Sequence, residues 1–493
     1  MIALSLACSH EHDISDQLVH EHEPDHVHDT GVDEDEIAWE ALLDEAVDRY
    51  THDGPPGVAF AVVLDGRLAY AAALGDATYG SDIPLTTDTV MRWNSVSKMH
   101  VALAAMQLAK EGIVDLEEPV STYLPEASID GDWSPDDLTL HQAMTHTTAL
   151  PDWWDTSCSP SLSEHWTDSA EALHAEPGTL YNYSNVGWSL AGAVLESASG
   201  TEFTELMRAW VIDPAGMETA TFDVAEVTQH PYSIGYSNGA YYTPDLNDCP
   251  WLRPAGWLHG SVEDLAHSVE AQLAGDLVDA GVWVGMHAQH PTYTASLSSA
   301  GYGYFAWSEG DVQLVGHGGS GGGHRSYVLM VPEEDFGVVV VANSGTWNPY
   351  GLAHSAIELF LGELDEPDPE EVRTDPDGWT KYEGTYEDSD GVGTVELSLG
   401  ATDPYLYVRF VDGTDTWYRM YQDGRDEFFF LQNGWNYVRL VPGDDDTVRY
   451  FASRYYVAER GAPAGPPPPR AQVEELEVRG AHKDPREPGE PLF

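Results

Sequence analysis

Two groups of short apolar runs, far apart along the chain, predict the strands of one antiparallel sheet. In the first group, Val58 to Leu64 and Arg67 to Leu74 flank Asp65-Gly66, a dipeptide typical of tight hairpin turns. The second group predicts four strands, at Tyr302 to Trp307, Val312 to Val315, Ser326 to Val331 and Gly337 to Ala342. About 220 residues of mostly helical and loop-forming sequence separate the two groups.

Helical spacing of apolar residues appears at both ends of this region. It is present between Ile37 and Tyr50, and again from about Gly351 to Leu361. We therefore expect an α+β fold, in which an antiparallel sheet is flanked by N- and C-terminal helices and a mainly helical region is inserted between its two halves.

A second, smaller unit is expected near the C-terminus. After an acidic linker at residues 363–378, short alternating runs continue to about residue 459, separated by the turn signals Asp390-Gly391, Asp412-Gly413, Asp423-Gly424 and Asn433-Gly434. This spacing predicts a small, barrel-like all-β domain over residues 379–459. The other expected segments are a signal-like start with a histidine-rich, acidic tether (1–36), the main domain (37–362) and a proline-rich tail (460–493).

The charge of the chain limits its partners. The formal net charge is −63, from 84 acidic and 21 basic residues. Because phosphate contacts require Lys and Arg, this balance excludes a nucleic-acid partner. Such a surface repels itself unless salt screens it, over about 3 Å at 1 M, so we expect a halophilic source. The chain is 42% hydrophobic and has no apolar run of about 18 residues, which indicates a folded protein without a membrane-spanning helix.

The N-terminal segment carries two patterns that need interpretation. Met1 to Ala7 is apolar and ends in Leu-Ala-Cys, similar to a bacterial lipoprotein signal but without the usual basic start. Cys8 is therefore either lipidated, which would attach the chain to a membrane outside the cytoplasm, or part of a disordered start. His22 to His26 matches the zinc pattern His-Glu-x-x-His, but a proline interrupts the helix that this motif needs. In an exported chain, Cys158 and Cys249 could pair as a disulfide.

Ser95 and Lys98 form a Ser-x-x-Lys motif at the start of a predicted helix. The run Val101 to Leu108 is a strong helix former, and Gly112 ends it. Amide dipoles at the start of the helix favour negative charge near Ser95 Oγ, and Lys98, one turn later, lies within reach of the hydroxyl. A neutral lysine there could take the serine proton. An isolated match is more often a helix cap beside a surface lysine, so other residues must decide.

Two later segments supply residues that complement this motif. Tyr183-x-Asn185 directly precedes a predicted helix from Val186 to Ser199, and Gly316 to Ser320 precedes the strand near Ser326. The order Ser-x-x-Lys, Tyr-x-Asn and His-x-Gly resembles the serine beta-lactamase-like superfamily, closest to class C beta-lactamases, DD-peptidases and related esterases.

The resemblance implies an acyl-enzyme mechanism that needs no metal and no organic cofactor. Ser95 would be the acylated nucleophile, and Lys98 would exchange protons with Ser95 and Tyr183. Tyr183 would shuttle a proton between Ser95 and the leaving group.

The same resemblance places substrate-binding groups on two elements. Asn185 would hydrogen-bond the substrate, and the backbone N–H groups of Ser95 and Ser320 would form the oxyanion hole. His317, Gly318 and Gly319 would lie on an edge strand, where the glycines let substrate lie against the backbone.

Supporting segments extend the resemblance from about residue 37 to residue 362. Thr145 to Pro151 is similar to the family's Thr-His-Thr-Ser-Gly-Leu-Pro segment, and Gly256 to Leu265 is similar to Gly-Gly-Leu-x-Ser-Thr-x-x-Asp-Leu. We interpret Thr145 to Pro151 as a helix-terminating loop without a chemical role. The substrate pocket would be shaped by Asp152 to Pro177 and Phe222 to Trp251, which carry no motif.

Two rival nucleophiles fail on their context. Ser237 and Ser320 both sit in Gly-x-Ser-x-Gly, but that motif requires a strand, a sharp turn and then a helix, and neither serine is followed by a helical pattern. Tyr236-Ser237-Asn238 imitates Tyr-x-Asn in the same unsuitable setting.

The leading hypothesis is therefore a serine hydrolase acting on D-amino-acid peptides, beta-lactams or small esters. His317 replaces the lysine of many beta-lactamases, which favours an esterase or a peptidase. The alternative is a non-catalytic binding protein on the same scaffold. We interpret the C-terminal β domain as a stabilising lid or spacer, and we expect a small-molecule or peptide substrate without an obligate protein partner.

Overall fold

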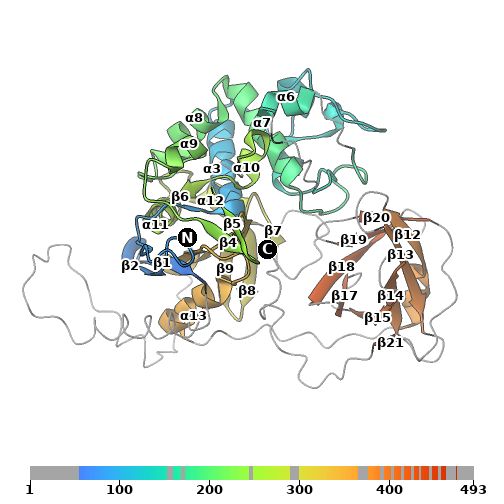
Figure 1. Cartoon of the computed structure of the whole chain (residues 1–493). Helices are drawn as coiled ribbons and strands as arrows, with labels where there is room; N and C mark the ends of the chain where they lie inside the picture. The colour runs from blue at the N-terminus through green and yellow to red at the C-terminus, as the bar shows by residue number, and fades with distance from the viewer. Residues whose placement is uncertain are drawn as a thin grey trace, which may run out of the picture.

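The computed structural model describes residues 55–152, 158, 160–167, 172–243, 248–288, 299–362, 364 and 376–388, and then 393–400, 405–411, 416–422, 427–431, 435–443, 447–453, 457–461 and 473–474. The predictions for the tether, Cys8, the histidine pattern at His22 and the helix over residues 37–50 lie outside the described residues. Within the described residues the fold is α+β, as the sequence predicts (Figure 1).

One seven-stranded antiparallel sheet forms the centre of the main domain. Its strand order is β2-β1-β11-β10-β9-β8-β7, so the two halves predicted from distant parts of the chain meet where β1 pairs with β11. The strands are β1 (Gly57–Leu64), β2 (Arg67–Gly75), β7 (Ser299–Ala300), β8 (Phe305–Glu309), β9 (Val312–Gly321), β10 (His324–Val331) and β11 (Phe336–Ala342). Asp65 and Gly66 both have positive φ, 52° and 68°, which the tight turn between β1 and β2 requires.

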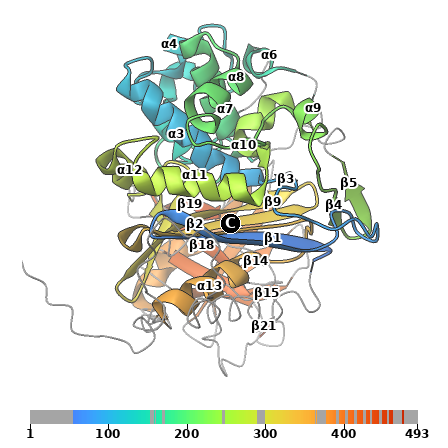
Figure 2. The ribbon, with the colours of Figure 1, turned by 90° about the vertical axis from the view of Figure 1, so that its left-hand side faces the viewer.

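Both faces of this sheet are covered, because alternate residues of β1 enter different apolar cores. Ala59 and Ala61 belong to the core that contains the helical region, whereas Phe60 and Val62 belong to the core under helix α13 (Tyr350–Leu361). Figure 2 shows α11 (Val262–Ala274) along one face of the sheet and α13 on the opposite face. The expected arrangement of helices on the faces of the sheet is confirmed.

The inserted region is mainly helical, and its two longest helices begin at the predicted motifs. Helix α3 (Ser97–Lys110) follows the 3-10 turn η1 (Asn94–Val96), and α7 (Asn185–Ser199) is capped by the Ser184 hydroxyl and ended by Gly200, whose φ is 65°. The shorter elements are β3 (Met91–Arg92), α4 (Val120–Tyr123), η2 (Pro135–Asp137), α5 (Leu140–Met144), α6 (Leu162–Thr167), α8 (Phe203–Met207), the π-turn η3 (Arg208–Ile212), α9 (Val224–Val227), β4 (Gly235–Ser237), β5 (Ala240–Tyr242), η5 (Pro250–Leu252), α10 (Arg253–Gly256), β6 (His259–Gly260) and α12 (Ala280–Met286).

Cys158 and Cys249 are joined in a disulfide, 91 residues apart in the sequence. The pairing that we considered for an exported chain is thus present. It links the two segments expected to shape the substrate pocket.

The C-terminal unit is all-β, as predicted. A curled sheet runs in the order β16-β17-β18-β19-β20-β12-β13-β14-β15-β21 (Figure 1). Its elements are the turn η7 (Pro376–Tyr382) and strands β12 (Gly384–Asp388), β13 (Gly393–Leu399), β14 (Leu406–Phe410), β15 (Trp417–Arg419), β16 (Tyr421–Gln422), β17 (Glu427–Leu431), β18 (Trp435–Pro442), β19 (Val448–Ser453), β20 (Val457–Arg460) and β21 (Val473–Glu474). The exact domain boundaries remain predictions.

This C-terminal unit packs on the main domain. Val441, Tyr450 and Ala452 belong to the same buried apolar cluster as the helical region. The imidazole Nδ1 of His174 also lies 3.9 Å from the carboxylate of Asp388, on β12. Over the part of the chain that is described, no helix is long and apolar enough to cross a membrane.

Candidate active site

Ser95 lies in η1, one residue before its end, at the junction between strand β3 and helix α3. The α-helix begins at Ser97, so Ser95 occupies a 3-10 turn instead of the first α-helical residue that the sequence indicated. Asn94 adopts a φ of 54°, which turns the chain sharply before the serine. Ser95 is partly accessible, while both of its neighbours are buried.

Lys98 is fully buried beside Ser95 and has three oxygen partners. Its Nζ lies 3.0 Å from Ser95 Oγ, 2.7 Å from Asn185 Oδ1 and 2.6 Å from the carbonyl oxygen of Ala255. Amide and carbonyl oxygens only accept hydrogen bonds. In a neutral lysine, two N–H bonds therefore point at Asn185 and Ala255, and the remaining lone pair faces Ser95 Oγ. This is the orientation that a general base needs.

Tyr183 completes the group on the loop before α7. Its side chain is buried, and its ring centroid lies 5.0 Å from Lys98 Nζ. The structure thus brings together Ser95, Lys98, Tyr183 and Asn185, which come from two segments about 90 residues apart. Their proposed chemical roles remain proposals, but their proximity is a finding.

The segment Thr145 to Pro151 packs on the Tyr-x-Asn loop more closely than a helix-terminating loop requires. The His146 ring stacks on the Tyr183 ring, with centroids 4.2 Å apart, and its backbone oxygen accepts a 2.8 Å hydrogen bond from Asn182 N–H. The N–H groups of Ser184 and Trp188 lie 2.9 and 3.1 Å from its two ring nitrogens. Because a neutral imidazole accepts at only one nitrogen, only one of these two N–H groups can donate to it. Sequence reasoning missed this residue as part of the site.

Strand β9 carries the predicted His317, Gly318, Gly319 and Ser320, but it is not an edge strand over its whole length. It pairs with β10 on one side and, from Val312 to Gly316, with β8 on the other. Among the described residues, the β8 pairing ends at Gly316. The edge position predicted for His317, Gly318 and Gly319 therefore agrees with this pairing, whereas Val312 to Gly316 lie between two strands.

Gly319 lies too close to a neighbouring segment to carry a side chain. A Cβ atom at this position would lie 2.2 Å from the Trp93 carbonyl oxygen and 2.3 Å from Ser326 Oγ. The close neighbour of Gly319 is thus the chain just before Ser95, and the expected contact of the glycines with substrate stays a prediction. This contact holds Gly319, the residue before the exposed Ser320, against the turn that contains Ser95.

His317 is buried behind the site and has aromatic neighbours. Its ring centroid lies 5.0 Å from that of Phe305 and 6.3 Å from that of Tyr183. Its Nδ1–H donates to the carbonyl oxygen of Gly318 at 2.5 Å. A histidine at this position thus packs on Tyr183, in contrast with the flexible, strongly hydrated lysine of many beta-lactamases.

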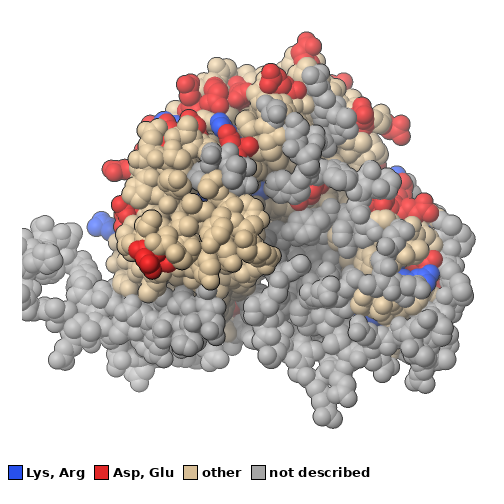
Figure 3. Space-filling model, viewed as in Figure 1, with Lys and Arg blue, Asp and Glu red and all other residues tan. Residues whose placement is uncertain are grey.

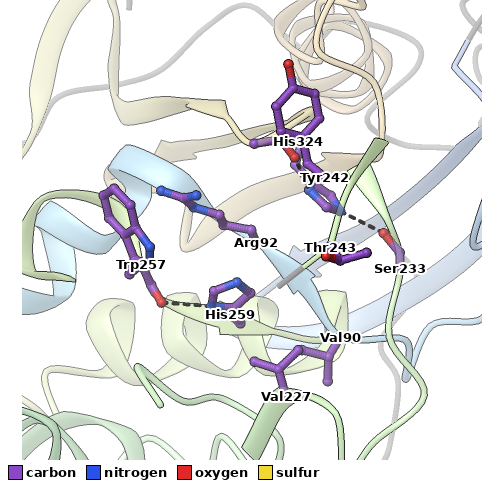
Figure 4. A pocket seen from close by; sticks show the side chains of 10 residues that line it. Val90, Arg92, Val227, Ser233, Tyr242, Thr243, Trp257, His259 and His324 are labelled. Carbon is purple, nitrogen blue, oxygen red and sulfur yellow. Dashed lines mark hydrogen bonds between the residues drawn. The ribbon is translucent and has the colours of Figure 1, made fainter. Parts of the chain in front are cut away.

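A small pocket behind the nucleophile turn holds a second polar cluster (Figure 4). The Arg92 guanidinium stacks on the Trp257 ring at 3.8 Å and donates to the Gly256 carbonyl oxygen at 2.9 Å, and burial lowers the pKa of Arg92 to about 9. Burial likewise lowers the pKa of His259 to about 3 and that of His324 to about 4.

This pocket supports the site without containing the nucleophile or its base. Asn94 Nδ2 donates to the backbone oxygen of His324 at 3.1 Å, and Ser326 Oγ donates to the Trp93 carbonyl oxygen at 2.6 Å. These bonds fix the residues before Ser95 to strand β10. We assign the pocket a supporting role.

The structure does not support the two rival serines. Ser237 ends strand β4, and a tight turn leads directly into β5, so no helix follows it. Ser320 lies within β9. Among the described residues, no group of three or more His, Cys, Asp or Glu side chains is arranged to hold a metal ion.

Comparison with known proteins agrees with this geometry. The chain is 27% identical over 349 residues to the D-alanyl-D-alanine-carboxypeptidase/endopeptidase AmpH of Escherichia coli K12, which covers 65% of this chain and 89% of AmpH. It is 23% identical over 298 residues to Protein flp of Staphylococcus aureus, covering 58% of this chain and 59% of flp, so it spans somewhat more than half the length of that relative.

Solved structures show the same fold. The crystal structure of SurE superimposes with a TM-score of 0.69 at 23% identity, over 86% of this chain and 99% of SurE. The octameric penicillin-binding protein homologue from Pyrococcus abyssi gives a TM-score of 0.56 at 23% identity, over 85% of this chain and 99% of its own. The family model for Beta-lactamase matches residues 40–362, so the chain belongs to the Beta-lactamase family and to the serine beta-lactamase-like superfamily.

Proposed function

We propose that the chain is a serine hydrolase that forms an acyl-enzyme at Ser95 on amide or ester substrates. The observation that carries the proposal is the position of the buried Lys98 Nζ, 3.0 Å from Ser95 Oγ and hydrogen-bonded to two oxygens that can only accept. This arrangement supports lysine as the base that activates the serine.

In the proposed reaction, Lys98 takes the Ser95 proton while Oγ attacks the substrate carbonyl carbon. The negative charge that develops on the carbonyl oxygen is stabilised by the backbone N–H groups of Ser95 and Ser320. Tyr183 transfers a proton to the leaving amine or alcohol as the C–N or C–O bond breaks, and it takes back the proton that Lys98 received from Ser95. Water then hydrolyses the Ser95 ester and restores the free enzyme.

The substrate class is proposed as a D-amino-acid peptide, a beta-lactam or a small ester. AmpH, named as a carboxypeptidase and endopeptidase, supports the peptide, and His317 in place of lysine supports a peptide or an ester over a beta-lactam. We also propose that the chain acts outside the cytoplasm, since a disulfide such as Cys158–Cys249 persists in an oxidising compartment.

Covalent labelling with a fluorophosphonate tests the proposal directly. Wild type should be labelled and Ser95→Ala should not. A chromogenic cephalosporin, a short-chain nitrophenyl ester and a D-alanyl peptide, compared side by side, should then rank the substrate classes. An unlabelled, folded wild type with no turnover of any of the three would favour the alternative, a non-catalytic binding protein on this scaffold.

A further inference from the structure

Asp152 belongs to no motif that the sequence analysis used, yet it holds Asn185 by two hydrogen bonds. Its Oδ1 accepts from the Asn185 backbone N–H at 2.9 Å and from Asn185 Nδ2–H, also at 2.9 Å. Asp152 directly follows Pro151, whose backbone oxygen accepts a 3.0 Å hydrogen bond from Ser184 Oγ. The Asp152 carboxylate is therefore positioned by the segment Thr145 to Pro151, which also packs on Tyr183.

These contacts decide which end of the Asn185 amide faces the lysine. An amide has a donor end, Nδ2, and an acceptor end, Oδ1. With Nδ2 on the carboxylate, Oδ1 lies 2.7 Å from Lys98 Nζ. The flipped amide would set Oδ1 against the Asp152 carboxylate, which places acceptor against acceptor. A carboxylate cannot donate, so only one orientation satisfies both neighbours.

We infer that Asp152 is a positioning residue for the acylation of Ser95. It fixes the acceptor end of Asn185 on Lys98 Nζ, and this contact, together with the Ala255 carbonyl oxygen, turns the lysine lone pair toward Ser95 Oγ. The inference rests on the proposed serine hydrolase function and adds to it a residue that acts through Asn185.

A purely structural role for Asp152 makes a different prediction. Asn185 is the first residue of α7, and a carboxylate that accepts its N–H also stabilises the start of the helix. If this were all, loss of the carboxylate would lower stability and leave the acylation rate of the folded protein unchanged. Rate and stability must therefore be measured separately.

The test is the rate of fluorophosphonate labelling of the full chain, with the melting temperature recorded for every variant. Asp152→Ala should slow labelling by about 10- to 100-fold, the usual cost of losing a group that orients an active-site ligand. Asp152→Asn should stay within about fivefold of wild type, because an amide oxygen in the same place still accepts both N–H groups. Glu202→Ala is the matched control and should label at the wild-type rate. Glu202 caps α8 by accepting from two backbone N–H groups, at 2.8 and 3.1 Å, and lies outside both segments expected to shape the pocket.

A double-mutant cycle asks whether Asp152 acts through Asn185. In an Asn185→Ala background, Asp152→Ala should change the labelling rate by less than about twofold. The same loss in both backgrounds, a loss in Asp152→Asn equal to that in Asp152→Ala, or an Asp152→Ala rate like that of wild type would each overturn the inference while the proposed function stands. A wild type that is not labelled would instead overturn the proposed function.

Discussion

His146 and Tyr183 stack nearly face to face, with 22° between their ring planes. The stack comes from two segments that are tied together by backbone hydrogen bonds, so the phenol ring has a fixed orientation beside Lys98. A displacement of about 1 Å at a reacting group can lower a rate by about 100-fold. Loss of the His146 ring, which fixes the orientation of Tyr183, should therefore lower the acylation rate.

We predict that His146→Ala slows fluorophosphonate labelling by about 10- to 100-fold. The control is His141→Ala on the neighbouring helix α5, whose Nδ1 lies 2.7 Å from the Tyr302 hydroxyl. It should label within about twofold of wild type. Equal rates for the two variants, measured on folded protein, would show that the stack has no part in acylation.

Substitution of the two lysines of helix α3 should affect the labelling rate very differently. Lys98→Ala removes the proposed base and should lower the labelling rate by at least about 100-fold, even where the fold is intact. Lys110 is exposed and pairs with Asp279 at 3.0 Å on the surface, so Lys110→Ala should leave the rate unchanged and cost at most about 1 kcal/mol of stability. Labelling retained in Lys98→Ala would refute its assignment as the base.

Gly319 should tolerate no side chain. In Gly319→Ala, the new Cβ would meet the Trp93 carbonyl oxygen at 2.2 Å, so strand β9 or the nucleophile turn must move, at a cost of about 1–3 kcal/mol in unfolding free energy. Gly281→Ala is the matched control on α12, where a Cβ meets nothing within 4 Å and the change should be neutral or stabilising by up to about 1 kcal/mol. Denaturant unfolding measures both. A Gly319→Ala variant as stable as wild type would mean that the contact is looser than the structure shows.

Three buried histidines should make the protein sensitive to mild acid. Burial lowers the pKa of His100 to about 4, of His259 to about 3 and of His324 to about 4, from the ordinary 6.5. The unfolded chain therefore binds more protons than the folded one below pH 6.5. Stability is full above that pH and falls as the pH drops toward 4, by up to about 1.4 kcal/mol per pH unit for each histidine.

The comparison variant is His100→Leu, which should show a shallower decline of unfolding free energy between pH 6.5 and 4.5. In the described part of the chain, His100 Nε2 is buried without a hydrogen-bond partner, so only the Val96 carbonyl oxygen at Nδ1 would offset the burial of a charged ring. Parallel pH profiles for wild type and variant would contradict the assignment.

The acidic surface predicts a salt requirement. Figure 3 shows acidic side chains spread over both the helical region and the C-terminal unit, with few basic ones among them. With a net charge of −63, the melting temperature should rise as sodium chloride increases from dilute buffer to molar concentration, because repulsion is screened. Greatest stability in dilute buffer would exclude the halophilic interpretation.

The sequence was enough to predict the split sheet, the helices on its faces, the all-β unit and the four residues gathered at the site. The elements rest on local signals, such as a hairpin turn or a helical period, whereas the four residues were grouped by the resemblance to the serine beta-lactamase-like superfamily. The residue pattern alone predicted β9 only at Val312 to Val315, because glycines at 316, 318 and 319 weaken a strand pattern, and the family resemblance supplied the strand at His317 to Gly319.

Asp152 and His146 could not be predicted as partners of the site. Their importance depends on a contact between two loops, and nothing in the residue types on either loop specifies that contact. A positive φ at His146, 58°, is visible only in the structure, although it is uncommon for a residue other than glycine. Contacts between segments far apart in the sequence leave no periodic pattern and no motif, which is why Asp152 and His146 were missed.

The disulfide between Cys158 and Cys249 has a consequence for how new specificities can arise in this protein. It ties together the two stretches expected to line the substrate pocket, while strand β9 and the turn that contains Ser95 are held elsewhere, by the contact of Gly319 with Trp93. A chimaera that replaced one stretch alone would leave one cysteine without its disulfide partner and one side of the expected pocket without its covalent link. The two stretches should therefore be exchanged as a pair, and a chimaera built that way would carry a new selectivity with Ser95 and the proposed base Lys98 unchanged.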